Sequence, residues 1–361
     1  MSQILTVIGA RPQFIKAAAV SRCFEKASGL TEILVHTGQH YDANMSDIFF
    51  DELGIPKPAH HLGIAGGGHG AMTGRMLAAV EDLLVEVQPD LVMVYGDTNS
   101  TLAGALAAAK LHIPVAHVEA GLRSFNKRMP EEINRILTDH CAELLFTPTD
   151  TATKNLLDEG MPQARIVECG DVMFDASLHF AKRAEEQAAG SKGRGLERGE
   201  YVLATVHRQE NTDDPVRLKA IIEGLAMVAK DMPVVLPLHP RTRARVEAES
   251  LSDALGDLQI IEPLGYLEMV GLEKDAAVIA TDSGGVQKEA FFHGVPCVTL
   301  RDETEWVELV DAGWNQLLSP TRADLVHAAI SGAKGTQGKA ITPYGSGNAS
   351  EVIVDRLKAF L

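Results

Sequence analysis

Two carboxylates in the first half of the sequence stand where general bases are often found. Asp97 follows the hydrophobic run LVMVY after one glycine, and Glu119 follows the run VAHV, so both stand in loops that leave predicted strands. Such side chains in neighbouring loops could remove a proton from a substrate and return one. Glu131 and Glu132 follow Pro130 at a predicted helix start, where a favourable interaction with the helix dipole is the alternative explanation. Asp97 and Glu119 are therefore candidates for acid/base chemistry, and Glu131 stays open between the two explanations.

Two cations stand at the first predicted strand-to-helix turn, in the stretch GARPQFIK. Arg11 precedes Pro12, a residue that suits the first position of a helix, and Lys16 lies just inside that helix. A pair of cations at such a turn suits an anionic ligand, whereas a solvated pair is commoner on an exposed helix face. The turn contains neither GxGxxG nor GK[ST], so neither a dinucleotide fingerprint nor a P-loop is present.

The strongest local signal lies in the second half, in the stretch TDSGGVQKE. A predicted strand leads through Ser283, Gly284 and Gly285 into a helix. Glycines let the backbone approach a phosphate, and a helix N-terminus presents unpaired N–H groups. Glu289 would face back along the first turn and accept hydrogen bonds from ribose hydroxyls. The alternative is a serine N-cap with an acid in the first turn. His207 follows another strand-like run, YVLATV, and joins the candidates.

The elements that must position these residues alternate between hydrophobic runs and amphipathic stretches. Strands are predicted over 4–8, 33–35, 91–95, 115–118, 144–146, 201–206, 234–238, 259–261, 277–280 and 297–300. Helices are predicted over 70–88, 100–111, 131–142, 151–159, 214–230, 284–293 and 347–361. This alternation predicts an α/β fold with parallel sheets, in which ligands bind beyond the carboxyl ends of the strands.

Length, charge and cysteine usage narrow the class of protein. A chain of 361 residues suggests two domains, and a formal net charge of −16 argues against nucleic-acid binding through phosphate contacts. Four scattered cysteines without ligand spacing argue against a zinc ribbon or disulfide framework and suggest a reducing compartment. The sequence contains no run of 18 apolar residues. We therefore expect a soluble, cytoplasmic protein without nucleic-acid or membrane partners.

Many ordered motifs together resemble the non-hydrolysing UDP-N-acetylglucosamine 2-epimerase family nearly from end to end. They are GARPQFIK, HTGQHYD, YGDTNSTLAG, HVEAGLRS, MPEEINRILTD, LFTPT, TVHRQEN, LHPRT, TDSGGVQKEA, LRDETE and YGSGNAS. The resemblance implies two Rossmann-like, doubly wound domains that face a cleft, as in B-type glycosyltransferases. It also implies a homodimer that needs neither a redox cofactor nor a metal.

The resemblance also implies a division of the chain. The polar, Gly-rich stretch 181–200 predicts a helix followed by an exposed linker. Members of the family have a C-terminal helix that crosses back onto the first domain. We therefore expect one domain over 1–172 plus 345–361, and a nucleotide-binding domain over 173–344.

The family inverts C2 of a UDP-sugar by eliminating UDP to a 2-acetamido-glycal and adding it back after protonation of the opposite face. By this resemblance Asp97, Glu119 and Glu131 are the acid/base set, and which of them gives the proton is open. His207 is the fourth catalytic residue that the resemblance implies, and it would contact the leaving diphosphate. The other residues carried over bind substrate. Arg11 and Lys16 would contact its phosphates and sugar, Ser283, Gly284 and Gly285 would cradle the diphosphate, and Glu289 would hold the ribose.

Three features resemble the subgroup that acts on UDP-2,3-diacetamido-2,3-dideoxy-D-glucuronate. They are the stretch 124–130, the stretch HGAMTGRM, and Trp306 where many members have an arginine. Lys127 and Arg128 could pair with the extra C6 carboxylate, or they form an ordinary exposed basic turn. We expect epimerisation to the manno form for surface polysaccharide.

Other functions remain open on the sequence. UDP-N-acetylglucosamine is the alternative substrate, which would give UDP-N-acetylmannosamine. A B-type glycosyltransferase would need an acceptor, and a nucleotide-sugar sensor would not exchange the C2 proton with solvent. A nicotinamide enzyme is remote because the dinucleotide fingerprint is missing.

Overall fold

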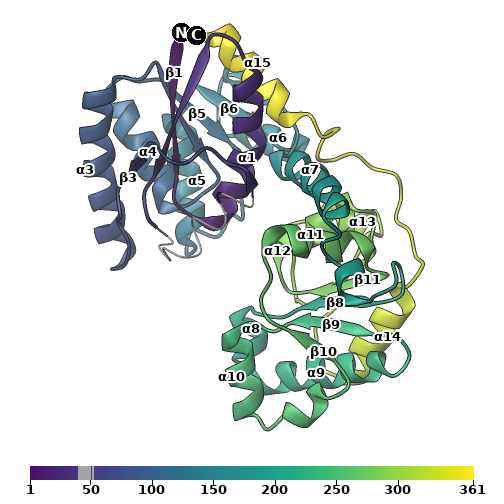
Figure 1. Ribbon diagram of the computed structural model, residues 1–361. Coiled ribbons are helices and arrows are strands. Elements are labelled where there is room, and N and C mark those ends of the chain that lie inside the picture. Colours follow the sequence, from purple (N-terminus) through teal and green to yellow (C-terminus); the bar gives the residue numbers. More distant parts are fainter. Residues whose placement is uncertain (40–49, 51–52) are drawn as a thin grey trace. The chain divides into compact units, whose positions relative to one another are not determined.

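The computed structural model describes residues 1–39, 50 and 53–361 (Figure 1). The end of the HTGQHYD motif, residues 40–42, therefore lies outside the described residues. Contacts between Cα atoms divide the chain into two compact units. Unit 1 comprises Met1–Ala176 and Thr342–Leu361, and unit 2 comprises Ser177–Ile341. The predicted domain limits at 172 and 345 lie close to these divisions. That each unit is a separate functional domain stays a prediction.

Unit 1 is built on a parallel sheet of seven strands in the order β3-β2-β1-β4-β5-β6-β7. The strands are β1 (Ser2–Ile8), β2 (Leu30–His36), β3 (His60–His61), β4 (Leu91–Tyr95), β5 (Val115–Val118), β6 (Leu144–Thr147) and β7 (Ile166–Glu168). The central strands β4, β5 and β6 are buried along their whole length, which explains their continuous aliphatic sequences.

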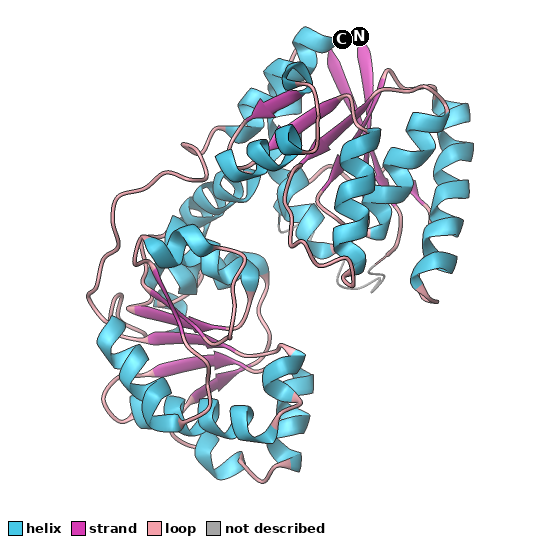
Figure 2. Cartoon of the chain, turned by 180° about the vertical axis from the view of Figure 1, so that it is seen from behind, coloured by secondary structure: helices cyan, strands magenta, loops and turns pink. Residues whose placement is uncertain are grey.

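Helices cover both faces of the unit 1 sheet (Figure 2). They are α1 (Arg11–Lys26), α3 (His69–Val87), α4 (Asn99–Lys110), α5 (Pro130–Cys141), α6 (Asp150–Asp158), the start of α7 (Val172–Glu186) and α15 (Ala349–Phe360). A single 3-10 turn spans Gln163–Arg165 among the described elements of this unit. The C-terminal helix α15 lies beside α1 (Figure 1), and Asp175 accepts hydrogen bonds from the first amides of α15, those of Ala349 and Ser350, at 3.1 and 2.7 Å.

Unit 2 has a parallel sheet of six strands in the order β10-β9-β8-β11-β12-β13. The strands are β8 (Val202–Thr205), β9 (Val234–Pro237), β10 (Gln259–Ile261), β11 (Val278–Thr281), β12 (Cys297–Thr299) and β13 (Asn315–Leu317). The helices are α8 (Gln209–Thr212), α9 (Pro215–Ala229), α10 (Pro240–Ala248), α11 (Tyr266–Asp275), α12 (Gly284–Phe292), α13 (Val307–Asp311) and α14 (Ala323–Ala333). Short 3-10 turns span Lys192–Arg194 and Ser252–Leu255.

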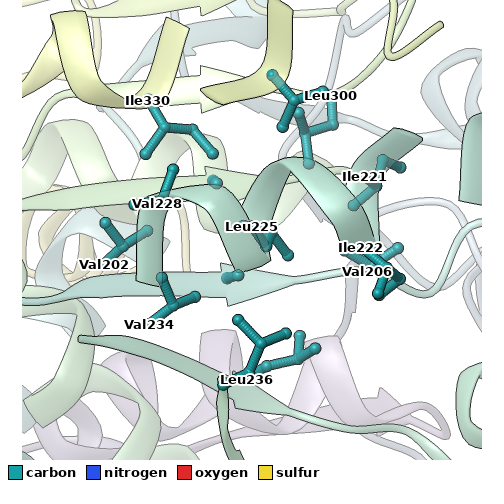
Figure 3. Close-up of a cluster of buried hydrophobic side chains, with 14 of the residues drawn as sticks. Val202, Val206, Ile221, Ile222, Leu225, Val228, Val234, Leu236, Leu300 and Ile330 are labelled. Carbon is teal, nitrogen blue, oxygen red and sulfur yellow. The ribbon is translucent and has the colours of Figure 1, made fainter. Parts of the chain in front are cut away.

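The hydrophobic core of unit 2 shows how the residues of α9 determine its packing against the sheet and against α14 (Figure 3). Leu225 and Val228 of α9 and Ile330 of α14 are buried against the aliphatic side chains of β8 and β9. A Cβ atom at Gly224 would lie 2.6 Å from the Cβ of Val326, so a glycine is needed for α9 and α14 to approach this closely. Burial of this apolar surface is the main term that stabilises the unit.

All ten predicted strands and all seven predicted helices are present within a few residues of their predicted limits. Three strands were not predicted, namely β3, β7 and β13. Each is two or three residues long and lies at the edge of its sheet, so none has the long hydrophobic run that marks a central strand.

The prediction of an exposed linker over 181–200 is wrong in part. Helix α7 continues to Glu186, and Ser191 beyond it is buried, with its hydroxyl donating to Asp275 at 2.5 Å. A Cβ atom at Gly190 would lie 2.6 Å from the carbonyl carbon of Gly271. The segment therefore packs against α11 because its small residues allow a close approach of two backbones.

Candidate active site

In unit 1 a cavity of about 170 Å³ opens at the carboxyl ends of the strands, where ligands bind in open α/β sheets. Three of the predicted site residues line it, namely Lys16, Asp97 and Glu131. The other lining residues are Ala10, Pro12, Gln13, Gln39, His69, Gly96, Thr98, Asn99 and Asn134. The cavity thus combines one cation and two carboxylates with several amide side chains. Of the described helices, α1, α3, α4 and α5 each contribute a residue to it.

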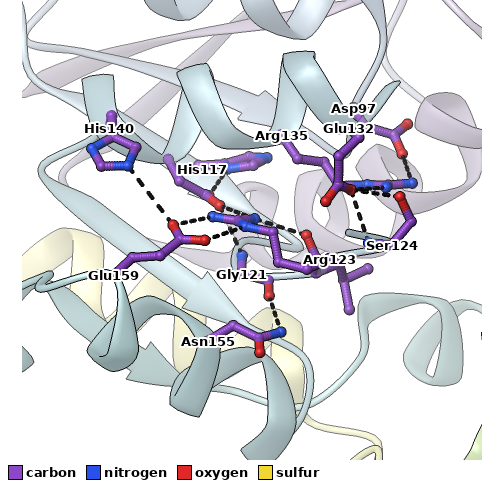
Figure 4. Close-up of polar contacts among 12 residues, drawn as sticks. Asp97, His117, Gly121, Arg123, Ser124, Glu132, Arg135, His140, Asn155 and Glu159 are labelled. Carbon is purple, nitrogen blue, oxygen red and sulfur yellow. Dashed lines mark hydrogen bonds and ion pairs between the residues drawn. The ribbon is translucent and has the colours of Figure 1, made fainter. Parts of the chain in front are cut away.

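Asp97 is held by an arginine from α5 (Figure 4). Its Oδ2 atom lies 2.6 Å from Nη2 of Arg135, while Nη1 of the same guanidinium lies 2.8 Å from Glu132. Burial lowers the pKa of Arg135, but the charge of Asp97 and hydrogen bonds to Glu132 and Asp97 outweigh it and raise that pKa. Asp97 is therefore paired with a permanent cation while 31% of its side chain stays exposed.

Glu119 forms an ion pair with Lys16, and both side chains are only 11% exposed. The backbone φ of Glu119 is 72°, a left-handed conformation that costs a residue with a side chain about 1–3 kcal/mol. Gly96 also has a positive φ, 61°, and a Cβ atom there would lie 3.1 Å from Oε2 of Glu119 and 3.3 Å from Nζ of Lys16. The glycine thus makes room for the ion pair.

Glu131 and Glu132 are adjacent in the first turn of α5, yet they differ in their contacts. Glu132 is buried and accepts hydrogen bonds at 2.9 Å from the backbone and hydroxyl of Ser124 and from the backbone of Phe125. Burial raises the pKa of Glu132, but these bonds and Arg135 outweigh it and lower that pKa. Glu131 lines the cavity and makes no ion pair among the described residues.

Several residues that position the site were not predicted from the sequence. Gln13 accepts hydrogen bonds from the amides of Gly9 and Ala10 and donates to the carbonyl oxygen of Tyr95, which ties the start of α1 to the end of β4. Asn134 donates to the carbonyl oxygen of Asp97 at 2.9 Å. An amide side chain carries no charge and forms these bonds over long sequence separations, so spacing alone does not reveal it.

Two predicted unit 1 residues, Arg11 and Glu119, do not line the cavity. Glu119 reaches its edge through the ion pair with Lys16, whereas Arg11 lies apart. It is the first residue of α1 and is exposed, whereas Lys16, one and a half turns later, is buried against the cavity. The two cations of the GARPQFIK stretch therefore occupy different environments.

In unit 2 a buried carboxylate organises the loop that carries His207. Asp282 is fully buried and accepts hydrogen bonds from the amides of His207 and Arg208 and from the side chain of Asn211, at 3.0–3.1 Å. The His207 ring is 47% exposed, and its Nε2 atom lies 3.9 Å from Oδ1 of Asp282. The backbone of His207 is thus fixed while its ring remains accessible.

The helix start at Ser283, Gly284 and Gly285 is open. The Ser283 side chain makes no capping hydrogen bond within the described residues, so the structure does not show the serine N-cap alternative. A Cβ atom at Gly284 would have Arg208 as its nearest described neighbour, at 3.6 Å, and one at Gly285 would have Glu289, at 4.0 Å. Internal packing therefore does not demand glycine at either position.

The surroundings of this helix start bring aromatic and charged groups together. Trp306 donates from its indole nitrogen to the carbonyl oxygen of Gly284 at 2.9 Å, and Nζ of Lys288 lies 4.3 Å from the Trp306 ring centroid. Glu289 is buried on α12 and accepts a hydrogen bond from the hydroxyl of Tyr266 at 3.0 Å. Glu305 lies 2.8 Å from Arg301.

Comparison with known proteins decides the family. The family model described as UDP-N-acetylglucosamine 2-epimerase matches residues 22–358. The chain belongs to this family. A curated relative from Pseudomonas aeruginosa, UDP-2,3-diacetamido-2,3-dideoxy-D-glucuronate 2-epimerase, is 55% identical over 98% of this chain and 99% of its own. The UDP-N-acetylglucosamine 2-epimerase of Methanocaldococcus jannaschii is 45% identical over 96% of each chain. The protein is thus a non-hydrolysing UDP-sugar 2-epimerase, an isomerase.

Solved structures share the architecture of this epimerase. The Methanocaldococcus jannaschii UDP-GlcNAc 2-epimerase in complex with UDP-GlcNAc and UDP matches with a TM-score of 0.85 and 43% identity, over 99% of this chain and all of that one. The Neisseria meningitidis enzyme bound to UDP-GlcNAc matches with a TM-score of 0.87 and 31% identity, with the same coverage. The prediction of two Rossmann-like domains of the B-type glycosyltransferase architecture is confirmed.

Two further observations concern cofactors and membranes. Among the described residues, no group of three or more histidine, cysteine, aspartate or glutamate side chains is arranged to hold a metal ion. No helix within the part of the chain that the structure describes is both long and apolar enough to span a bilayer.

Proposed function

We propose that this epimerase inverts C2 of its UDP-sugar by anti elimination of UDP to a 2-acetamido-glycal, followed by re-addition. The supporting observation is the gathering of Asp97, Glu119 and Glu131 with Lys16 at one end of the unit 1 sheet. Elimination needs a base for the C2 proton, and inversion needs an acid on the opposite face of the sugar. Several carboxylates in different environments can divide these tasks.

The contacts of the three carboxylates support a division of roles. Asp97 is paired with Arg135 and Glu119 with Lys16, so a cation holds each of these carboxylates in a fixed position, as a base that must reach the C2 proton requires. Glu131 has no such partner among the described residues. We therefore assign proton removal to one of the two paired carboxylates and proton return to Glu131.

We assign the leaving diphosphate to unit 2. The uncapped start of α12 at Ser283, Gly284 and Gly285 offers backbone N–H groups and the positive end of a helix dipole. The accessible His207 ring would stabilise charge that develops on the diphosphate as the C1–O bond breaks. Glu289, held by Tyr266, would accept hydrogen bonds from the ribose. In unit 1, Lys16 and Arg11 would contact phosphate and sugar.

We infer that the substrate is UDP-2,3-diacetamido-2,3-dideoxy-D-glucuronate, epimerised to its manno form for surface polysaccharide. The relative with this activity is 55% identical to the chain. Lys127 and Arg128 are exposed in the loop that leads to Glu131, where they would face the C6 carboxylate of a uronate. UDP-N-acetylglucosamine is the alternative substrate. A homodimer and a cytoplasmic location stay predictions.

Proton NMR in D₂O tests the reaction and the substrate together. The enzyme is incubated separately with each of the two UDP-sugars. We expect a manno product with deuterium at C2 from the uronate alone. Turnover of UDP-N-acetylglucosamine would favour the alternative substrate. An absence of C2 exchange with both would contradict epimerisation of these sugars and would require a search for transferase acceptors.

The double variant Lys127→Ala/Arg128→Ala tests the recognition of the carboxylate. We expect the KM for the uronate to rise about tenfold because a charge-assisted contact is lost, with little change in kcat. Lys154→Ala is the matched control, since Lys154 is an exposed lysine that pairs with Asp158 on α6. An unchanged KM in the double variant would show that 127–128 is an ordinary exposed basic turn.

A further inference from the structure

A network of buried polar side chains joins β5 and α5 to the loops that follow β4 and β5 (Figure 4). Its centre is His117 on β5, which is fully buried. The Nδ1 atom of His117 lies 2.7 Å from Oδ1 of Asp139, and its Nε2 atom lies 2.7 Å from the carbonyl oxygen of Gly96. One imidazole ring thus connects helix α5 to the end of strand β4.

The hydrogen-bonding partner of Nε2 determines the proton on that atom. A carbonyl oxygen only accepts, so Nε2 of His117 must donate to Gly96. The other oxygen of Asp139 accepts from the amide of Gly121 at 3.2 Å and lies 2.7 Å from Nη1 of Arg123. Both nitrogens of the His117 ring thus lie against oxygen atoms of groups that are themselves held in place.

Arg123 completes the charge balance of the network. Its guanidinium contacts Asp139 and forms two hydrogen bonds to Glu159, at 2.7 and 2.8 Å. Burial raises the pKa of Asp139, but the charges and hydrogen bonds of His117 and Arg123 outweigh it and lower that pKa. The Arg123 guanidinium therefore lies between two carboxylates, and these charges are paired.

The network is attached to backbone that would not hold its conformation unaided. Gly96, whose carbonyl oxygen accepts from His117, directly precedes Asp97. Glu119 has a left-handed backbone although it is not a glycine, and Gly121, with a φ of 80°, donates to Asp139. Such strained backbone conformations persist where contacts with the surrounding structure hold them in place. The hydrogen bond to Gly96 therefore fixes the backbone just before Asp97, and the hydrogen bond from Gly121 fixes the backbone just after Glu119.

We propose that His117 and Asp139 are a positioning pair for proton transfer at C2, which rests on the role assigned above to Asp97 and Glu119. His117 holds the Gly96 carbonyl and so sets the direction in which Asp97 leaves β4. Asp139 holds Gly121 and so fixes the turn that aims Glu119 at Lys16. Neither residue lines the cavity, so both act through the two carboxylates.

Two substitutions of His117 separate its two hydrogen bonds. The amide nitrogen of an asparagine mimics Nδ1 and can donate to Asp139, whereas that of a glutamine mimics Nε2 and can donate to Gly96. We expect His117→Asn to lower kcat about 10- to 100-fold with a KM within about twofold of the wild type, as misplaced catalytic groups do. We expect His117→Gln to recover most of that loss.

Deuterium partition provides a readout that loss of stability would not change. In D₂O, the ratio of C2 deuterium in recovered substrate to that in product depends on how the carboxylates face the two sides of the sugar. We expect this ratio to change in His117→Asn and to stay near the wild-type value in His117→Gln. Leu145→Ala is the stability control, because Leu145 is the fully buried β6 neighbour of His117 and takes no part in the network.

Three results would overturn the proposal. They are equal losses of kcat in the two His117 variants, a partition ratio unchanged in His117→Asn, or a ratio that Leu145→Ala changes as much. If the wild type shows no C2 exchange, the proposed function fails, and amide hydrogen exchange over 96–121 still decides the positioning. Protection lost in His117→Asn and retained in His117→Gln supports the pair, and equal protection in both contradicts it.

Discussion

Asp97 and Asp282 show how the same place in two similar sheets can give opposite environments. Strand β4 lies beside β1 in unit 1 as β11 lies beside β8 in unit 2, and an aspartate follows each of them. Asp97 faces a cavity, with one cation beside it and 31% of its side chain exposed. Asp282 is fully buried, and its oxygens accept hydrogen bonds from the loop that carries His207.

This difference shows that the hydrogen-bond donors around a carboxylate determine whether it holds a loop together or stays accessible to a ligand. Backbone and amide N–H groups occupy the oxygens of Asp282, so that residue fixes the loop that carries His207. Arg135 leaves one side of Asp97 accessible, so that residue can exchange a proton with a substrate. This contrast supports our proposal that proton transfer takes place at the strand ends of unit 1 and diphosphate binding at those of unit 2.

The largest effect that sharpens this contrast is expected from Asp97→Asn. The amide cannot accept the proton, so kcat should fall about 10²- to 10⁴-fold. The free energy of unfolding should change by less than about 1 kcal/mol, because the lost ion pair is partly exposed and Arg135 keeps Glu132. Steady-state kinetics and urea denaturation measure the two quantities. A large loss of stability with unchanged kcat would assign Asp97 the structural role instead.

The next effect is the pH dependence of the free energy of unfolding, to which the two units should contribute equally. Burial lowers the pKa of His36 in unit 1 and of His293 in unit 2 to about 4, with smaller contributions from His61 and Lys274. An unfolded histidine titrates near 6.5, so the unfolded state binds more protons between pH 6.5 and 4. Stability should therefore fall as the pH drops through this window, by about 3 kcal/mol for each histidine.

His36→Asn and His293→Asn test the two contributions separately. Each substitution should remove about half of the pH dependence of the free energy of unfolding, as measured by urea denaturation between pH 7 and 4.5. His140→Asn serves as a control because that ring is 50% exposed. A pH dependence that neither substitution reduces would show that other groups control acid unfolding.

The third effect is a loss of stability expected from Asp282→Asn. The side-chain NH₂ group of the new asparagine would face backbone and side-chain N–H groups that now donate to Asp282. We expect this loss of an acceptor to lower the free energy of unfolding by about 2 kcal/mol. Because His207 moves with this loop, KM should rise more than kcat falls. Asp257→Asn, at an exposed aspartate, is the control for a charge change in unit 2. A stable variant with an abolished kcat would break the contrast between the two aspartates.

The sequence predicts the fold far better than it predicts the working arrangement of the site. Continuous aliphatic runs reveal the buried central strands, and their ends reveal Asp97 and Glu119. The partners of these residues lie elsewhere in the chain, as Arg135 does for Asp97, so they depend on how the elements pack. Local spacing likewise cannot distinguish Asp97 from Asp282, because the difference lies in donors brought by tertiary structure.

The same limit applies to the backbone of Glu119 and to His117. A positive φ at a glutamate is contrary to local preference and exists because the surrounding network holds it. His117 stands within a hydrophobic run and looks like an ordinary buried histidine until Gly96 and Asp139 are seen on either side of its ring. Such residues become visible only when hydrogen-bond partners distant in sequence are known.

The most direct test of the central claim compares C2 deuterium exchange in Asp97→Asn and Asp282→Asn. Each folded variant is incubated in D₂O with saturating UDP-sugar, and proton NMR follows the C2 signal. The account predicts that exchange is lost in Asp97→Asn and persists in Asp282→Asn, because saturation compensates for weaker diphosphate binding. Exchange that persists in Asp97→Asn but disappears in Asp282→Asn would contradict the assignment of proton transfer to unit 1.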